Sequence, residues 1–159
     1  MGNIFSASEV VELGILIEKN GRDFYNAVLS QLKDEKSGEL FVFLAREEEK
    51  HIIKFTQILD SIQKYEPPES YAQEYVAYMR SLADGYVFTR ANSGKEIGNK
   101  VKSEKEAIDL GLGFEKDSIL FYEGMKKAVP DFDLKIIDEL IAQEKRHLEL
   151  LAQLKSSIK

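Results

Sequence analysis

The chain has 159 residues, enough for one domain to bury a core without disulfide bonds. It carries 22 Lys and Arg against 28 Asp and Glu, and this net charge of −6 argues against a surface for nucleic acid or anionic lipid. It contains no cysteine, which excludes thiol catalysis, cysteine-ligated zinc and iron–sulfur clusters. We therefore expect one domain over residues 1–159, without a nucleic-acid partner.

The N-terminal residues allow two interpretations. Residues 1–6 match the short pattern for N-myristoylation, whereas Ser6 with Glu9 forms a capping box that would begin a helix. We favour the capping box, because so short a lipidation pattern arises easily by chance. No charged segment followed by an apolar one indicates a secretory signal, and no apolar run is long enough to span a bilayer. A cytoplasmic protein with no membrane partner is expected.

Apolar residues recur at spacings of three and four along most of the chain, which is the period of amphipathic helices. They predict four long helices, at about 7–31, 39–64, 103–128 and 134–157. Residues 34–38 are expected to turn the first helix into the second, and residues 129–131 the third into the fourth. Pro67 and Pro68 are expected to end the second helix, and a second capping box, Ser103 with Glu106, to begin the third.

Residues 65–102 form a long link between the second and third helices. Within it, residues 71–83 resemble a short helix and residues 85–98 are rich in turn residues. Helices of about 25 residues are roughly 38 Å long, a length that this link can cover. We expect an all-α four-helix bundle of two hairpins, joined by one crossover that runs the length of the bundle. The aromatic residues of the link are expected to pack on the bundle or on a partner chain: Tyr71, Tyr75, Tyr78, Tyr86 and Phe88.

An internal repeat relates the two predicted hairpins. Residues 13–19, LGILIEK, reappear as LGLGFEK at 110–116, and an FY pair follows each copy at the same offset. The partner helices each carry a Glu-x-x-His sequence, at residues 48–51 and 144–147. Two related hairpins indicate a bundle with a pseudo-two-fold axis.

Each hairpin contributes one Glu from its first helix and a Glu-x-x-His from its second. The six residues are Glu18, Glu48, His51, Glu115, Glu144 and His147. In each antiparallel pair the two Glu residues are equally far from the turn, so they lie at the same height. All six interrupt apolar stripes and are expected to face the interior, whereas a solvated charged face accounts well for Glu47, Glu49 and Lys50. Four buried carboxylates would repel one another, and two divalent cations would balance them.

This ligand pattern resembles that of the ferritin-like di-iron carboxylate proteins. The local strings around Glu18 and Glu48 are most similar to the rubrerythrin branch of that superfamily. The resemblance implies two iron ions at the six residues, and manganese or zinc would also suit these ligands. Two features depart from the family pattern. The chain has no cysteine for a rubredoxin-type iron site, and Ser118 stands where the third helix usually carries a second Glu.

The resemblance implies an oxidoreductase that reduces hydrogen peroxide or dioxygen with electrons from an external donor protein. A ferroxidase or an iron-binding, storage or detoxification protein is the alternative, and a helical interaction module with a structural metal is a third hypothesis. Tyr25 and Tyr122 are either core aromatics or hydrogen-bond donors to a ligand carboxylate or a bound oxygen species. Apolar residues on further faces of the first and third helices suggest burial under the link or in a subunit interface, and we expect a homodimer or a larger homo-oligomer.

Overall fold

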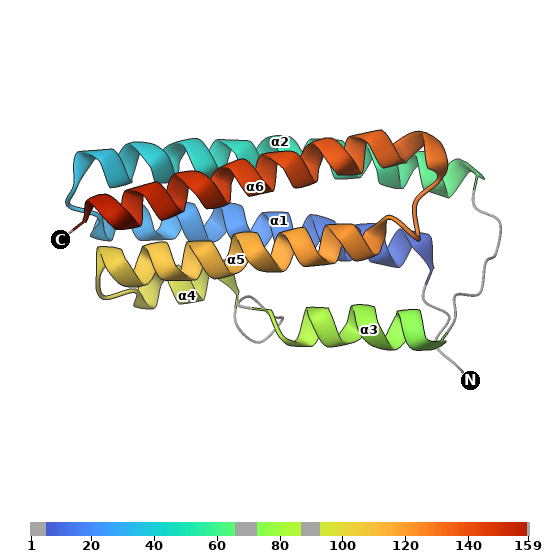
Figure 1. The fold of residues 1–159 in the computed structure, drawn as a ribbon, viewed down its shortest axis with the longest axis horizontal. Coiled ribbons are helices and arrows are strands. Elements are labelled where there is room, and N and C mark those ends of the chain that lie inside the picture. The colour runs from blue at the N-terminus through green and yellow to red at the C-terminus, as the bar shows by residue number, and fades with distance from the viewer. Residues whose placement is uncertain (1–5, 66–72, 87–92, 159) are drawn as a thin grey trace.

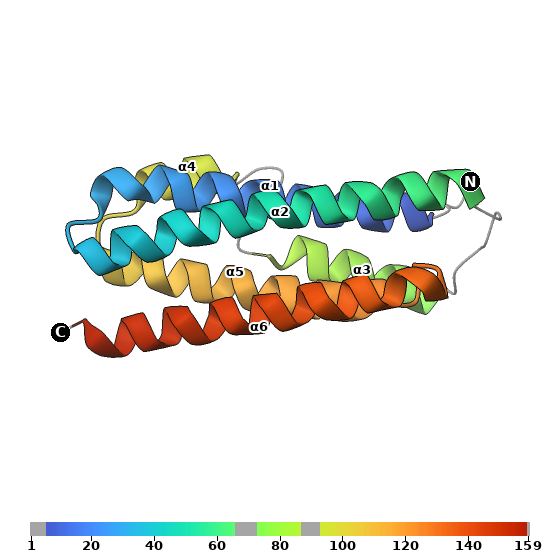
Figure 2. The ribbon, with the colours of Figure 1, turned by 90° about the horizontal axis from the view of Figure 1, so that it is seen from above.

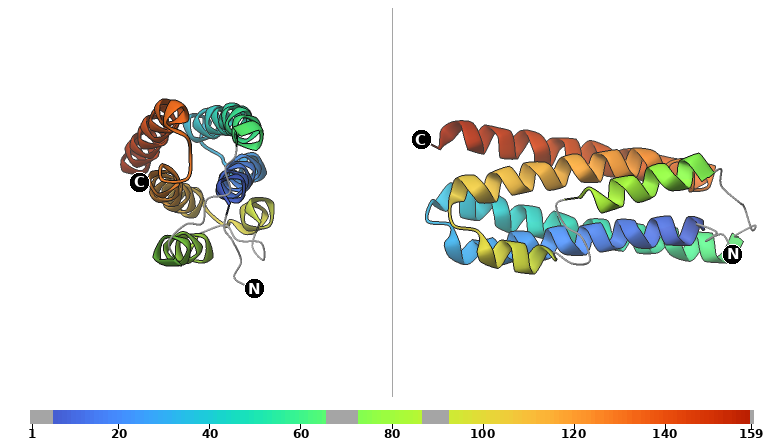
Figure 3. Two further views of the ribbon diagram at one scale, coloured as in Figure 1. Left: turned by 90° about the vertical axis from the view of Figure 1, so that its right-hand side faces the viewer. Right: turned by 90° about the horizontal axis from the view of Figure 1, so that it is seen from below.

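A computed structural model describes residues 6–65, 73–86 and 93–158, although not the side chains of residues 63–65. These residues form helices and no strand, so the expected all-α fold is confirmed. The long helices are α1 (Ala7–Val28), α2 (Glu35–Tyr65), α5 (Glu104–Met125) and α6 (Leu134–Ser157). Seen end on, they occupy the four corners of a bundle (Figure 3). In the described residues no helix is both long and apolar enough to cross a membrane.

The four helices form two antiparallel hairpins, as expected. Short 3-10 helices at Leu29–Gln31 and Asp131–Asp133 lie in the two turns (Figure 1). Viewed from above, α2 and α6 lie on the near side of the bundle with α1 and α5 behind them (Figure 2). Buried apolar residues from all four helices form one core.

The link contains two helices, α3 (Gln73–Asp84) and α4 (Gly94–Lys100). Helix α2 ends at one end of the bundle and α5 begins at the other, so the link crosses the bundle lengthwise, as expected (Figure 1). Helix α3 packs against α5, and α4 packs against α1. The Tyr75 hydroxyl donates to the Gly124 carbonyl at 2.8 Å, and the Tyr86 ring contacts the Phe121 ring. These two aromatics therefore pack on the bundle.

The prediction that residues 85–98 form turns is wrong from Gly94 onward, where α4 begins. Its glycines allow a close approach rather than a turn. A Cβ at Gly94 would overlap the backbone carbonyl of Asn20, and one at Gly98 would lie 2.7 Å from the Ala27 Cβ. Both glycines are buried, and they bring α4 directly onto the backbone of α1.

One predicted helix start needs correction, whereas Ser103 begins α5 as expected but with only half of the predicted capping box. Helix α2 begins at Glu35 and not at residue 39, because the Asp34 carboxylate accepts from the backbone N–H and the hydroxyl of Ser37. The Ser103 hydroxyl does accept from the Glu106 N–H, but the Glu106 carboxylate accepts from the Lys102 N–H, so the second capping box is not reciprocal.

The capping box of Ser6 and Glu9 is present and begins α1. The myristoylation pattern falls largely on residues 1–5, which lie outside the described residues, as do Pro67, Pro68, Tyr71 and Phe88.

Candidate metal centre

All six predicted ligand residues meet in the interior of the bundle. Helix α1 provides Glu18 and α5 provides Glu115, each from the middle of its helix. Helices α2 and α6 each provide a Glu and, one turn later, a His. The four Glu residues have no exposed surface, and the two His residues are at most 2% exposed. Apolar neighbours on the same helix faces, such as Phe41 and Phe55, account for this burial.

The six side chains form two overlapping groups whose ligand atoms lie within 4.8 Å of one another. One group is Glu18, Glu48, His51 and Glu144, and the other is Glu48, Glu115, Glu144 and His147. Glu48 and Glu144 belong to both groups, whereas each His and each remaining Glu belongs to one. This is the arrangement needed for two ions that share two carboxylates.

The histidines turn the same nitrogen, Nδ1, toward the carboxylates. His51 Nδ1 lies 2.6 Å from Glu144 Oε1 and 3.5 Å from an oxygen of Glu48. His147 Nδ1 lies 3.4 Å from Glu48 Oε1 and 3.6 Å from Glu115 Oε1. The two rings are stacked, with centroids 5.6 Å apart and planes 13° from parallel.

The six side chains present eight buried nitrogen and oxygen atoms that have no hydrogen-bond partner, in spite of these short contacts. They are Glu18 Oε2, both carboxylate oxygens of Glu48, Glu115 Oε2, both carboxylate oxygens of Glu144, and Nδ1 of His51 and of His147. A buried polar atom without a partner costs about 1–3 kcal/mol, so eight in one place call for a ligand. Oxygen and imidazole nitrogen atoms suit iron, manganese or zinc, and the donor set therefore fits a pair of such ions.

Burial and the neighbouring charges give the carboxyl groups of the cluster different pKa values. Burial, together with the charges of Glu18 and Glu115, raises the pKa of Glu48 well above its ordinary value. Burial and the charges of the other three carboxylates likewise raise the pKa of Glu144. Burial also acts to raise the pKa of Glu18, but His51 and the hydrogen bonds around Glu18 outweigh burial and lower it. Without metal, part of the cluster therefore keeps its protons to a higher pH than is usual for carboxyl groups.

The histidines supply the positive charge of the metal-free cluster. Burial lowers the pKa of His51, but Glu144 and Glu18 outweigh burial and raise it well above the ordinary value. Burial opposes the charged form of His147 as well, and Glu115 and Glu144 still raise its pKa. Metal ions would take over this role and leave the imidazoles neutral.

Tyr25 and Tyr122 both contact predicted ligands, but across the bundle. The Tyr25 hydroxyl donates to Glu115 Oε1 at 2.7 Å, and the Tyr122 hydroxyl donates to Glu18 Oε1. Each tyrosine thus donates its hydrogen bond to the Glu of the other hairpin and not to the Glu two turns earlier on its own helix. Burial, followed by the charges of nearby carboxylates, raises the pKa of both hydroxyls well above the ordinary value. Both tyrosines therefore stay protonated as donors.

Two residues beside the cluster were not predicted. Gln143 Oε1 lies 2.7 Å from Nε2 of His51, on the ring edge that faces away from the carboxylates. Glu47 was assigned to a solvated face, which is wrong because its side chain is only 15% exposed and its carboxylate lies within 4.8 Å of both histidines. The repeat gave a signal for this pair, because each residue directly precedes the Glu of a Glu-x-x-His sequence.

The neighbouring charged residues match the expected solvated face. The Lys50 side chain is 69% exposed, and Glu49 is 53% exposed and pairs with Arg22 at 2.6 Å. Ser118 is fully buried, and its hydroxyl donates to the Phe114 carbonyl of its own helix at 3.0 Å. Its hydroxyl is therefore engaged by the backbone.

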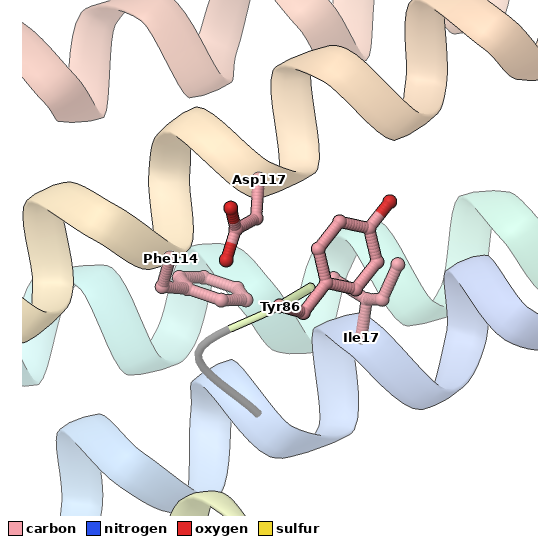
Figure 4. A pocket seen from close by; sticks show the side chains of 4 residues that line it. All are labelled: Ile17, Tyr86, Phe114 and Asp117. Carbon is pink, nitrogen blue, oxygen red and sulfur yellow. The ribbon is translucent and has the colours of Figure 1, made fainter. Parts of the chain in front are cut away.

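A separate pocket of about 170 Å³, including its open mouth, is lined by Ile17, Tyr86, Phe114 and Asp117 (Figure 4). Ile17 and Phe114 directly precede Glu18 and Glu115, and adjacent residues of a helix point about 100° apart. The pocket therefore lies on a different face of α1 and α5 from the carboxylates. Its lining includes one carboxylate and no histidine, unlike the central cluster.

The bundle with its central Glu and His cluster defines the class of ferritin-like proteins with a carboxylate–histidine metal site. The sequence model of the rubrerythrin family matches residues 9–155, and the chain belongs to this family. A solved structure from Thermotoga maritima, described as a ferritin-like di-iron carboxylate protein, is similar with a TM-score of 0.69. That protein is 25% identical, and the similarity covers 98% of each chain. No curated protein matches the chain.

Proposed function

We propose that the six residues hold two iron ions, and that the chain reduces hydrogen peroxide, or dioxygen, with electrons from an external donor protein. The observation that carries this proposal is the set of eight unpartnered nitrogen and oxygen atoms at one buried point. Membership of the rubrerythrin family supports iron over the other metals that these ligands suit. The Thermotoga maritima protein, described as a di-iron carboxylate protein, supports the same choice.

The ligand roles follow from the two overlapping groups. Glu18 and His51 would hold one ion, and Glu115 and His147 the other. Glu48 and Glu144 would be shared, since both groups contain them. Four carboxylates carry four negative charges, and two divalent ions balance them without any cation from the protein.

Two adjacent ferrous ions supply two electrons, the number that converts one hydrogen peroxide and two protons into two waters. The side chains of the protein orient the ligand carboxylates and shield the site from bulk water. The Tyr25 and Tyr122 hydroxyls each occupy one oxygen of Glu115 and Glu18, which fixes these carboxylates with the other oxygen free. Because both hydroxyls stay protonated, they act as fixed donors beside the reacting centre. Buried aromatic rings around the cluster exclude bulk water, and Phe55 packs directly on Tyr122.

A single-turnover experiment tests this function without knowledge of the donor. Protein loaded anaerobically with two equivalents of ferrous ion is mixed with hydrogen peroxide or with dioxygen, and iron oxidation is followed by stopped-flow absorbance. We expect peroxide to oxidise both ions faster than dioxygen does, with one peroxide consumed per chain. Faster reaction with dioxygen and repeated oxidation of added ferrous ion would indicate a ferroxidase instead. Oxidation no faster than that of free ferrous ion would indicate a structural metal.

The Glu49→Gln variant is the matched control, because Glu49 is an exposed neighbour of Glu48 on the same helix. It should react as wild type does. The Glu48→Gln variant should lose the rapid phase, because it removes a carboxylate that both ions share.

A further inference from the structure

Each histidine of the cluster has a second ring nitrogen, Nε2, besides the Nδ1 that faces the carboxylates. Nδ1 of His51 faces the carboxylates, and its Nε2 lies 2.7 Å from Gln143 Oε1. A neutral histidine that offers Nδ1 to a metal carries its proton on Nε2, where an acceptor is needed. The side-chain oxygen of Gln143 is such an acceptor, and Gln143 is an exposed residue on the surface of α6. Packing of the core therefore does not account for the position of the Gln143 side chain, whereas its hydrogen bond to His51 does.

The repeat places a different residue at the equivalent position of α2. Gln143 directly precedes Glu144, and Glu47 directly precedes Glu48. The Glu47 carboxylate lies within 4.8 Å of one ring nitrogen of each histidine, and its side chain is mostly buried. Its Oε1 accepts from Lys50 at 2.7 Å. A carboxylate thus stands on one side of the pseudo-two-fold axis where an amide stands on the other.

We propose that these two residues position the histidines across the hairpins and make the two metal positions unequal. Gln143 on α6 holds the Nε2 proton of His51 on α2, and Glu47 on α2, whose carboxylate lies within 4.8 Å of a ring nitrogen of His147, would hold the Nε2 proton of His147 on α6. A carboxylate acceptor strengthens the imidazole as a donor more than an amide does. The ion bound by His147 and Glu115 is therefore held more tightly than the ion bound by His51 and Glu18. This inference rests on the proposed metal site, but not on iron or on peroxide reduction.

Zinc alone is the probe, because it is diamagnetic and accepts the same ligands. Zinc is added stepwise to protein labelled with ¹⁵N at histidine, and the two imidazoles are followed by NMR while calorimetry gives the affinities. In wild type, the His147 signals should reach their bound positions at the first equivalent and the His51 signals at the second. The His51 Nε2–H proton should be protected from solvent exchange in the loaded protein.

Three variants distinguish a role in positioning the histidines from a general role in the stability of the fold. Gln143→Leu should weaken one zinc step by about 10–100-fold and expose the His51 Nε2–H to exchange, while the other step stays unchanged. The double variant Glu47→Gln with Gln143→Glu exchanges the two acceptors at constant net charge. It should reverse the order, so that His51 fills first. Gln153→Leu, an exposed substitution further along α6, is the control and should behave as wild type.

The outcomes are distinguishable. If wild type binds two zinc ions but the acceptor exchange leaves the filling order unchanged, the inequality is not set by these residues and the inference is wrong. If Gln143→Leu leaves both affinities and the protected His51 signal as in wild type, the positioning role of Gln143 is wrong as well. If wild type binds no zinc, the metal site itself fails, and the inference fails with it.

Discussion

Tyr25 on α1 donates a 2.7 Å hydrogen bond to Glu115 on α5, a residue 90 positions later in the chain. Its repeat partner, Tyr122, donates in the opposite direction to Glu18. The two bonds join the first helices of the hairpins at the level of the cluster, and all four residues are fully buried. Each bond satisfies one carboxylate oxygen and leaves the other free for a metal ion.

The Tyr25→Phe and Tyr122→Phe variants should each destabilise the metal-free protein. Removal of either hydroxyl leaves a buried carboxylate oxygen without its donor, which costs about 1–3 kcal/mol. Urea unfolding of the metal-free variants measures this loss. Tyr78→Phe, at a half-exposed position on α3, is the control and should change the free energy of unfolding by less than about 0.5 kcal/mol. Equal stability of all three variants would show that the buried hydroxyls do not support the carboxylates.

The metal-free protein should lose stability as the pH rises from mildly acidic values toward alkaline ones. The folded-state pKa values of Glu48 and Glu144 are raised well above the ordinary value, so the folded chain holds more protons than the unfolded chain. Stability from a raised pKa is complete below the unfolded value, about 4.3 for Glu, and is lost as the pH rises through the folded value. Urea unfolding at a series of pH values measures the slope. The Glu48→Gln variant should flatten it, and an identical slope in this variant would contradict the assignment.

Metal binding should release protons, and metal affinity should rise with pH over the same range. The ions must displace protons from Glu48, Glu144 and the histidines, because all of these hold protons more firmly than usual in the metal-free fold. Calorimetric titration in buffers of different ionisation enthalpy counts the released protons. Binding without proton release at neutral pH would be inconsistent with a buried tetracarboxylate site.

Iron should protect the wild-type fold and fail to protect a variant that lacks one of the proposed ligands. Because metal binds the folded site and hardly the unfolded chain, ferrous ion at 100 times its dissociation constant adds about 2.7 kcal/mol of stability. Glu18→Ala and Glu48→Gln should lose most of this gain, whereas Glu49→Ala should retain it. Anaerobic melting curves with and without ferrous ion provide the comparison. A similar iron-induced shift in all four proteins would place the bound iron elsewhere.

The close approach of α4 to α1 makes its glycines sensitive to substitution. Gly94→Ala places a Cβ against the backbone of Asn20 and should cost about 1–3 kcal/mol, because α4 must move away. Gly38→Ala is the matched control, since a Cβ there meets nothing within 4 Å and lies in the first turns of α2. It should raise stability by up to about 1 kcal/mol. Chemical unfolding decides the prediction, which fails if the two variants change stability in the same direction.

The fold and the meeting of the six cluster residues could be predicted because local signals agreed. Glu and His interrupt regular apolar stripes, and the repeat shows the same interruption in both hairpins. Helix α4 was missed because a glycine that permits close packing looks like a glycine that permits a turn. The hydrogen bonds of Tyr25 and Tyr122 to the opposite hairpin could not be predicted either. The sequence shows which face of a helix a residue lies on, but not which neighbouring helix it contacts. The contact of Gln143 with His51 depends in the same way on the packing of α2 against α6.

Anomalous diffraction from crystals grown anaerobically with ferrous ion tests the dinuclear site most directly. Data collected on both sides of the iron absorption edge locate iron independently of the protein atoms. The account predicts two iron peaks per chain, about 3.5–4 Å apart, between Glu18 and His51 on one side and Glu115 and His147 on the other. It also predicts that Glu48 and Glu144 contact both peaks. The absence of iron from the centre of the bundle, with peaks only at exposed acidic residues, would contradict the account.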